Sequence, residues 1–191
     1  MNRIKLMNKH FRKNKGKPNQ NVTDLINGDF DRALERAHKL LSEKKMAEPI
    51  LLKTANTDYE DLNYRLTKNG AENEFLVEYN NTLLTAIFLG EEELNYYQTV
   101  IDHVTGNINE DIVGEVKYRD VSNTELTINN DRDSKGTLLS KVSLDLHLAG
   151  GGLLTFDLRN HYNFNEEKYP DVLTQKEQYI VDIIKRAVNT K

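Results

Sequence analysis

The side chains best suited to acid–base or metal chemistry are the five histidines. Their spacing in the sequence places none of them in a known metal-ligand pattern. They are His10, His38, His103, His147 and His161. No two of them stand four residues apart, as the histidines of a helical zinc motif do. The chain has no cysteine, which excludes disulfides, thiolate chemistry and cysteine-based zinc sites. The histidine pattern therefore predicts no metal centre.

Two histidines have polar neighbours in the sequence. Asp102 precedes His103, and the run Asp102–Gly106 has the composition of an acid–base cluster, but we interpret His103 as a histidine in a turn. His161 follows Arg159 at the end of a predicted strand. This second group either binds an anion or forms the edge of the sheet before a loop.

The remaining motif candidates are read as structural. Glu91, Glu92 and Glu93 occupy a predicted hairpin tip, where adjacent acids point in different directions and stay solvated. The run 129–133 lacks the spacing and the closing Glu of a calcium loop, and no phosphate-loop or nucleophile-elbow motif is present. Gly150–Gly152 joins two predicted strands, whereas phosphate cradles open a helix. The sequence therefore predicts no catalytic residue, no metal and no cofactor.

Charge is distributed unevenly along the 191 residues. The first 20 residues contain seven basic side chains and no acid: Arg3, Lys5, Lys9, Arg12, Lys13, Lys15 and Lys17. The rest of the chain has 19 basic and 30 acidic residues, a net charge of −11. We predict a flexible basic arm over residues 1–20, which either only adds solubility or contacts an anionic membrane or nucleic acid. The acidic remainder argues against nucleic acid as a partner.

Hydrophobic periodicity defines the elements that follow this arm. Apolar residues recur at helical spacing over 22–45, and Asn27–Gly28 is expected to separate a first turn from a main helix at 29–45. Residues 46–73 are interpreted as a connector, with a short helix within 57–66. The sequence thus divides into an arm (1–20), a helical segment with its connector (21–73) and a β-rich body (74–191).

The body shows a period of two. Seven strands are expected, at 75–79, 83–89, 94–101, 112–118, 124–128, 142–148 and 154–158. A polar loop is expected at 129–136. The chain then ends in an amphipathic helix, which begins at the capping box formed by Thr174 and Glu177.

The order of these elements resembles the bacterial members of the pleckstrin-homology-like superfamily. The passage Val116–Leu126 is similar to the segment that links two strands in those domains, and Leu146–Arg159 is similar to their last hairpin. The resemblance covers residues 75–190. It implies a seven-stranded antiparallel bent sheet or barrel that is capped by the C-terminal helix. With the helical segment before it, which lies outside the resemblance, the expected fold is α+β. The resemblance also implies a scaffold that binds proteins, peptides or lipids. Phosphoinositide binding is not expected, because the first strand loop, Asn80–Thr82, has no basic residue.

Three functions follow as hypotheses. The first is a non-catalytic module that binds a protein or peptide in a bacterial cytoplasm, contacting its partner through residues 22–66, the basic arm or the loop 129–136. The second is attachment to an anionic membrane or nucleic acid through the arm, with Arg159 and His161 as further anion contacts. The third is an enzyme whose site lies in the loops 102–110 and 159–163. Self-association through residues 22–66 is a further expectation, and the lack of a long apolar run or secretory signal predicts a cytoplasmic location.

Overall fold

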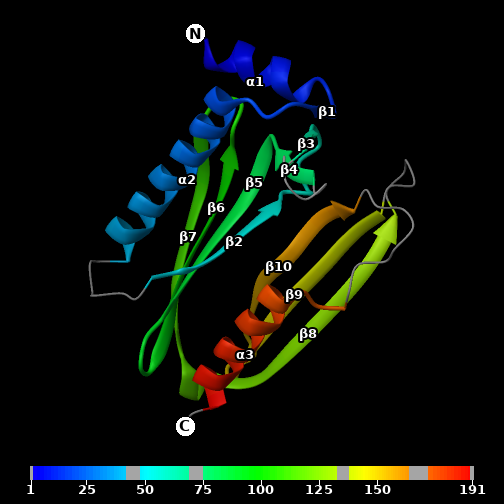
Figure 1. Ribbon diagram of the computed structural model, residues 1–191. Coiled ribbons are helices and arrows are strands. Elements are labelled where there is room, and N and C mark those ends of the chain that lie inside the picture. Colours follow the sequence, from blue (N-terminus) through cyan, green and yellow to red (C-terminus); the bar gives the residue numbers. More distant parts are fainter. Residues whose placement is uncertain (1, 42–47, 69–74, 133–137, 164–171, 190–191) are drawn as a thin grey trace.

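The computed structural model describes residues 2–41, 48–68, 75–132, 138–163 and 172–189. Within these residues the chain forms α-helices, one 3-10 helix and a series of strands (Figure 1). In chain order the elements are α1 (Arg3–Phe11), β1 (Lys15–Gly16), α2 (Gln20–Leu40), β2 (Ile50–Ala55), β3 (Tyr64–Lys68), β4 (Phe75–Tyr79), β5 (Asn81–Leu89), β6 (Glu93–Asp102), β7 (Asn107–Lys117), η1 (Tyr118–Asp120), β8 (Val121–Arg132), β9 (Leu138–Leu148), β10 (Leu153–Asn163) and α3 (Gln175–Asn189).

The described strands form three sheets. The largest has the order β2-β5-β6-β7 and is antiparallel throughout. A second antiparallel sheet has the order β10-β9-β8, and a small third sheet has the order β1-β3-β4. β10 lies beside β2, where the Asn160 side-chain amide donates to the carbonyl oxygen of Ala55 at 3.1 Å. The fold is therefore α+β with mostly antiparallel sheets.

Alternation along β5 divides the interior into two cores. Leu84, Ala86 and Phe88 point to one face of the large sheet and pack against α2. Ile87 points to the other face and packs in a core shared with β9, β10 and α3. Because both faces are covered, this strand reads as continuously apolar, as predicted for a central strand. Figure 1 shows α2 along the large sheet and α3 beside the β8–β10 sheet.

The sequence predicted the strands of the body well. All seven expected strands are present as β4–β10. Two of them are longer than expected: β7 begins at Asn107 and β8 runs to Arg132. The expected loop 129–136 is therefore strand up to residue 132, and its remainder lies outside the described residues. The expectation of a single seven-stranded sheet or barrel was wrong: the strands are divided among three sheets, and the described residues form no closed barrel.

The N-terminal elements differ most from expectation. Residues 3–11, predicted to be part of a flexible arm, form α1, whose Met7 and Phe11 are buried against Val22 of α2. α2 runs without interruption through Asn27–Gly28, because Gly28 is tolerated inside a helix whose apolar face is held by the sheet. Residues 46–73 were expected to contain a short helix, but 50–55 and 64–68 are strands.

The C-terminal helix begins as predicted. The backbone N–H of Glu177 donates to the Thr174 hydroxyl at 3.2 Å, and the Glu177 carboxylate accepts from the Thr174 N–H at 2.8 Å. This reciprocal pair is the capping box inferred from the sequence. Among the described residues, none of the helices has the length and apolar character needed to span a membrane.

Candidate anion-binding site

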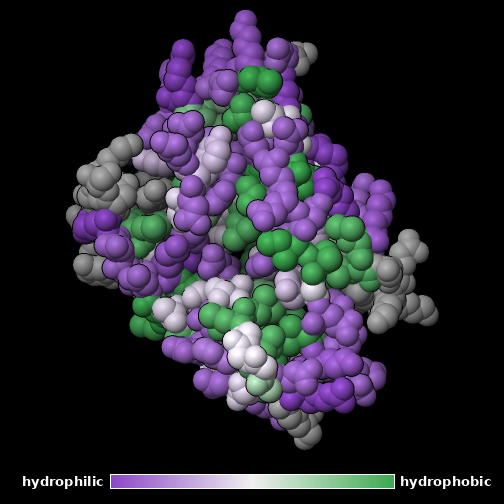
Figure 2. All heavy atoms as spheres, turned by 180° about the vertical axis from the view of Figure 1, so that it is seen from behind, coloured by the Kyte–Doolittle hydropathy of each residue, from purple (hydrophilic) through white to green (hydrophobic). Residues whose placement is uncertain are grey.

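The basic side chains of the N-terminal region lie on a folded surface. Six of the seven are exposed on α1 and on the connection to α2: Lys5, Lys9, Arg12, Lys13, Lys15 and Lys17. The apolar residues of α1 face α2, so its cations are left on the solvent side. Seen from behind, the end of the molecule that carries α1 is mainly hydrophilic, whereas hydrophobic side chains reach the surface in the middle and lower parts (Figure 2).

The connection between α1 and α2 is held in place by β3. β1 pairs with β3 in parallel, and the Leu66 N–H donates to the carbonyl oxygen of Asn14 at 2.8 Å. The Arg65 guanidinium donates to the carbonyl oxygens of His10 and Lys13 at 2.8 and 3.1 Å. These bonds fix the backbone from which the basic side chains project.

These elements enclose a hollow of about 500 Å³. Its lining consists of Leu6, Lys9, His10, Arg12, Lys13, Lys17, Pro18, Asn19, Gln20 and Arg65. Five of these residues are lysine or arginine, and none is acidic. Two carboxylates are bonded to polar lining residues: Glu78 to the His10 ring at 2.8 Å, and Asp24 to the Gln20 amide, which donates at 2.7 Å. The hollow therefore concentrates positive charge in a chain whose net charge is negative.

A second hollow of about 420 Å³, between α2 and β7, differs in its charge balance. Arg32 in its wall is bonded to Asp29 and to the carbonyl oxygen of Gly106, and Arg36 forms an ion pair with Asp111. Glu35 also lines it. Its arginines are thus already engaged by the protein, which makes it a weaker candidate for an external anion.

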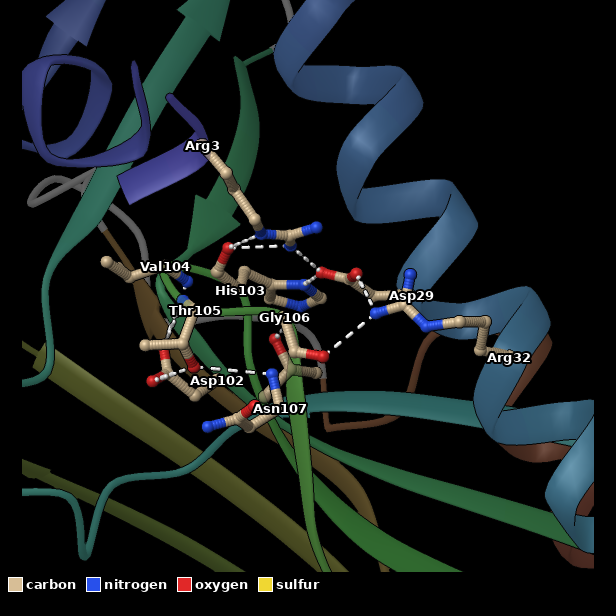
Figure 3. Close-up of polar contacts among 10 residues, drawn as sticks. Arg3, Asp29, Arg32, Asp102, His103, Val104, Thr105, Gly106 and Asn107 are labelled. Atoms are coloured by element: carbon tan, nitrogen blue, oxygen red, sulfur yellow. Dashed lines mark hydrogen bonds and ion pairs between the residues drawn. The ribbon is translucent and has the colours of Figure 1, made fainter. Parts of the chain in front are cut away.

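A buried polar cluster lies between α1, α2 and the large sheet (Figure 3). The Asp29 carboxylate is bonded to the His103 ring nitrogen Nδ1 at 2.8 Å and to the guanidinium groups of Arg3 and Arg32. Arg3 also donates to the carbonyl oxygen of His103, through Nε at 3.2 Å and Nη2 at 2.8 Å. Both Asp29 and His103 are fully buried.

The acid next to His103 in the sequence is not its partner. Asp102 accepts from the Val104 N–H at 2.9 Å and the Thr105 hydroxyl at 2.7 Å, which closes the turn between β6 and β7. The turn was expected, but the burial of His103 was not. Neighbouring side chains at a strand end point to opposite sides, so His103 turns inward to Asp29 while Asp102 stays at the turn.

The cluster has the chemical order of an acid–histidine–hydroxyl relay. The second ring nitrogen of His103 lies 3.2 Å from the Thr82 hydroxyl. Burial tends to raise the pKa of the Asp29 carboxyl, but the bonds and charges of His103 and Arg3 outweigh it and hold this pKa below its usual value. Thr82 and His103 are both buried, and neither lines the two hollows described above. The arrangement therefore ties α1 and α2 to the large sheet through buried polar contacts.

Three of the nine predicted anion contacts are engaged inside the protein. Arg3 belongs to the buried cluster. Arg159 is buried and donates through Nε to Glu177 at 2.8 Å and through Nη1 to the Ser140 hydroxyl at 3.0 Å. His161 stacks on Tyr79, and burial, together with the charge of Arg159, lowers its pKa to about 4. Arg159 thus belongs to the interior of the body, and neither Arg159 nor the partly buried His161 lines the hollow in the N-terminal region.

Comparison with known protein families, with curated proteins and with solved structures gives no significant match to this chain. The chemistry of the site itself is therefore the basis for any functional inference.

Arg65 and Asp29 were not identified from the sequence. Asp29 could have been, since it stands on the apolar face of α2 between Ile26 and Ala33, and a buried acid needs a partner. Arg65 carries no such signal, because its role depends on β1 meeting β3 across a separation of some 50 positions.

Proposed function

We propose that the protein is a non-catalytic binding module that recognises an anionic partner through the basic hollow at its N-terminal end. The observation that carries this proposal is the lining of the hollow, where five lysine and arginine residues meet without a carboxylate. Like charges held together on a folded surface repel one another, and an anion relieves that repulsion. Lys9, Arg12, Lys13 and Lys17 were among the predicted contacts, and Arg65 completes the group.

Burial of the acid–histidine–hydroxyl row supports a binding role over a catalytic one. A general base must come within hydrogen-bond distance of the proton that it removes. Asp29, His103 and Thr82 use their polar atoms on one another in the interior. This leaves recognition by surface charge as the chemistry that the described residues support best.

We also propose that the part from β2 onward is a divergent pleckstrin-homology-like scaffold. Its support is the order of the elements: a four-stranded antiparallel meander, a three-stranded antiparallel meander and a C-terminal helix. The β3–β4 hairpin is then an insertion between the first two strands of the meander. In this proposal the basic hollow is lined by α1, the connection to α2, the first residue of α2 and Arg65 of the inserted β3, outside the scaffold.

The binding proposal is tested with the full chain and three anionic probes. These are a single-stranded oligonucleotide, a polyglutamate peptide and vesicles that contain phosphatidylserine, with phosphatidylcholine vesicles as the neutral control. We expect at least one anionic probe to bind at low ionic strength and to be released as salt is added, because exposed charges are screened. A variant in which Lys9, Arg12, Lys13 and Lys17 are all glutamine should lose this binding. If neither these probes nor a small polyvalent anion binds at low ionic strength, the proposal is wrong.

A further inference from the structure

The hollow is built around Arg65, whose side chain reaches across from β3 to the connection after α1. Gly16 makes room for it: a Cβ at this position would stand 1.7 Å from the Arg65 Nη2 atom. Two backbone carbonyl groups, of His10 and Lys13, accept from Nη1 of the guanidinium. The buried Nε atom of Arg65 has no hydrogen-bond partner among the described residues. The bonds to the two carbonyl groups thus fix the Arg65 cation within the basic lining.

Four further cations surround this fixed guanidinium. Lys9 and Arg12 project from the last turn of α1 and its end, and Lys13 and Lys17 from the connection to α2. The structure shows no ion pair for any of these four within the described residues. Their positive charge is therefore available to a ligand, unlike that of Arg32 and Arg36 in the second hollow.

We propose that this hollow binds a compact polyphosphate, that is, a small molecule with two or more phosphate groups. The inference rests on the proposed function and names the chemical class of its ligand.

Phosphate matches the number and the type of the cations better than a carboxylate does. A phosphate monoester carries roughly −1.5 to −2 charges and three acceptor oxygens at neutral pH, so two or three phosphate groups balance five cations. Arginine binds phosphate with two parallel N–H donors, and lysine binds it as a point charge. Arg12 can supply the first kind of contact, and Lys9, Lys13 and Lys17 supply the second. Arg65 contributes its charge, because its Nη1 atom is already bonded to two backbone carbonyl groups and its Nε atom is buried.

The surroundings favour a compact ligand over a long polyanion. The hollow has a volume of about 500 Å³. That volume is within the roughly 300–1,000 Å³ typical of small-molecule sites. Beyond the first 20 residues the chain has a net charge of −11, so a polymer that extends past the hollow meets repulsion. Asp24 of α2 and Glu78 of β4 stand close to its border.

Calorimetric titration of the full chain at low ionic strength tests this inference. The ligands are tripolyphosphate, pyrophosphate, orthophosphate and citrate, which is a compact polycarboxylate. We expect tripolyphosphate to bind at least about tenfold more tightly than citrate, since charge-assisted bonds from arginine favour phosphate. Affinity should fall from tripolyphosphate to pyrophosphate to orthophosphate as phosphate groups are removed.

Two variants with equal charge changes locate the site. Lys13→Gln with Lys17→Gln removes two cations from the hollow, whereas Lys5→Gln with Lys15→Gln removes two exposed cations of the same region that do not line it. The first variant should weaken tripolyphosphate binding by about tenfold or more, and the second by less than about threefold. Because all four side chains are exposed, both variants should unfold at the wild-type urea concentration.

Each other outcome contradicts the inference. Equal affinity for citrate and tripolyphosphate means that the site does not distinguish phosphate from carboxylate. Equal losses in the two variants mean that the whole region, and not the hollow, attracts the ligand. If tripolyphosphate does not bind while one of the macromolecular probes does, the compact ligand is wrong and the anionic-partner function stands. If neither binds, both proposals are wrong.

Discussion

Asp29 on α2 and His103 after β6 are separated by 74 positions, yet their side chains meet at 2.8 Å with both residues fully buried. The contact joins the long helix to the turn between β6 and β7. Arg3 extends it to α1 by bonding both the Asp29 carboxylate and the His103 carbonyl oxygen. One buried carboxylate thus holds three parts of the chain together, and the N-terminal helices depend on it.

Replacement of Asp29 by Asn should lower the free energy of unfolding by about 3 kcal/mol, because the variant removes the counter-charge of Arg3 and the buried carboxylate to which the His103 ring is bonded. Urea denaturation measures this change. Asp31→Asn is the matched control: it removes the same charge from an exposed position of the same helix, and we expect a change below about 0.5 kcal/mol. Equal unfolding midpoints for the two variants would show that the buried cluster contributes no stability.

The sequence specified the β-rich body because its strands alternate cleanly. Leu144 and Leu146 face the core while Ser143 and Asp145 do not, and this period of two survives into the structure. The N-terminal region has no such clarity. α1 has only a few apolar residues, among them Met7 and Phe11, between its basic ones. They form a buried helical face because α2 provides the surface on which they pack.

The partners of the polar residues could not be inferred from local order. His103 follows Asp102 in the chain but pairs with Asp29, and Arg159 precedes His161 by two positions but pairs with Glu177. Both pairings join elements that are far apart in the sequence, by 74 and 18 positions. The excess of basic residues before position 20 is evident from the sequence. The hollow could not be predicted from it, because its lining includes Arg65, which β3 brings to the N-terminal region.

Gly16→Ala should displace the Arg65 side chain from its position in the lining of the hollow. The new Cβ would stand 1.7 Å from the guanidinium, so the side chain has to leave and gives up its bonds to the His10 and Lys13 carbonyl oxygens. We expect a loss of about 1–2 kcal/mol in stability. Hydrogen exchange should show faster exchange at the Leu66 N–H, which is bonded to Asn14 in the connection.

Gly28→Ala is the control for this change. A Cβ at position 28 meets no atom within 4 Å, and the residue lies inside α2. Alanine should therefore stabilise the helix by roughly 0.5–1 kcal/mol. If Gly16→Ala is as stable as Gly28→Ala and leaves the exchange of Leu66 unchanged, Arg65 does not hold the connection.

Glu177 has two roles that separate variants can distinguish. It completes the capping box with Thr174, and it forms the buried ion pair with Arg159. Glu177→Gln should lower the free energy of unfolding by about 3 kcal/mol, because Arg159 loses its counter-charge in the interior. Thr174→Ala removes only the cap and should cost about 1 kcal/mol. Thermal unfolding of the two variants compares these losses, and similar values would mean that the ion pair adds nothing to the cap.

His161 should make the stability of the protein fall in mild acid. Burial, together with the charge of Arg159, lowers its pKa to about 4, against an ordinary value of 6.5. Between these two pH values the unfolded chain holds a proton that the folded protein does not, so stability decreases as the pH falls through this window. His161→Phe keeps a ring against Tyr79 but cannot take up the proton. The free energy of unfolding of the wild type should therefore fall relative to that of His161→Phe, by up to about 3 kcal/mol from neutral pH to about pH 4.

Urea unfolding at several pH values in this window measures the effect. Asp29 and Glu177 both have pKa values below their usual range, so their contributions are present above the ordinary carboxyl pKa and are lost only at lower pH. The two carboxylates therefore change the stability mainly at pH values below the range in which His161 does. Tyr79→Phe keeps both the stacked ring and the histidine, and it should retain the wild-type dependence on pH. Parallel pH profiles for the wild type and His161→Phe would show that His161 takes up its proton equally well in the folded and unfolded chains.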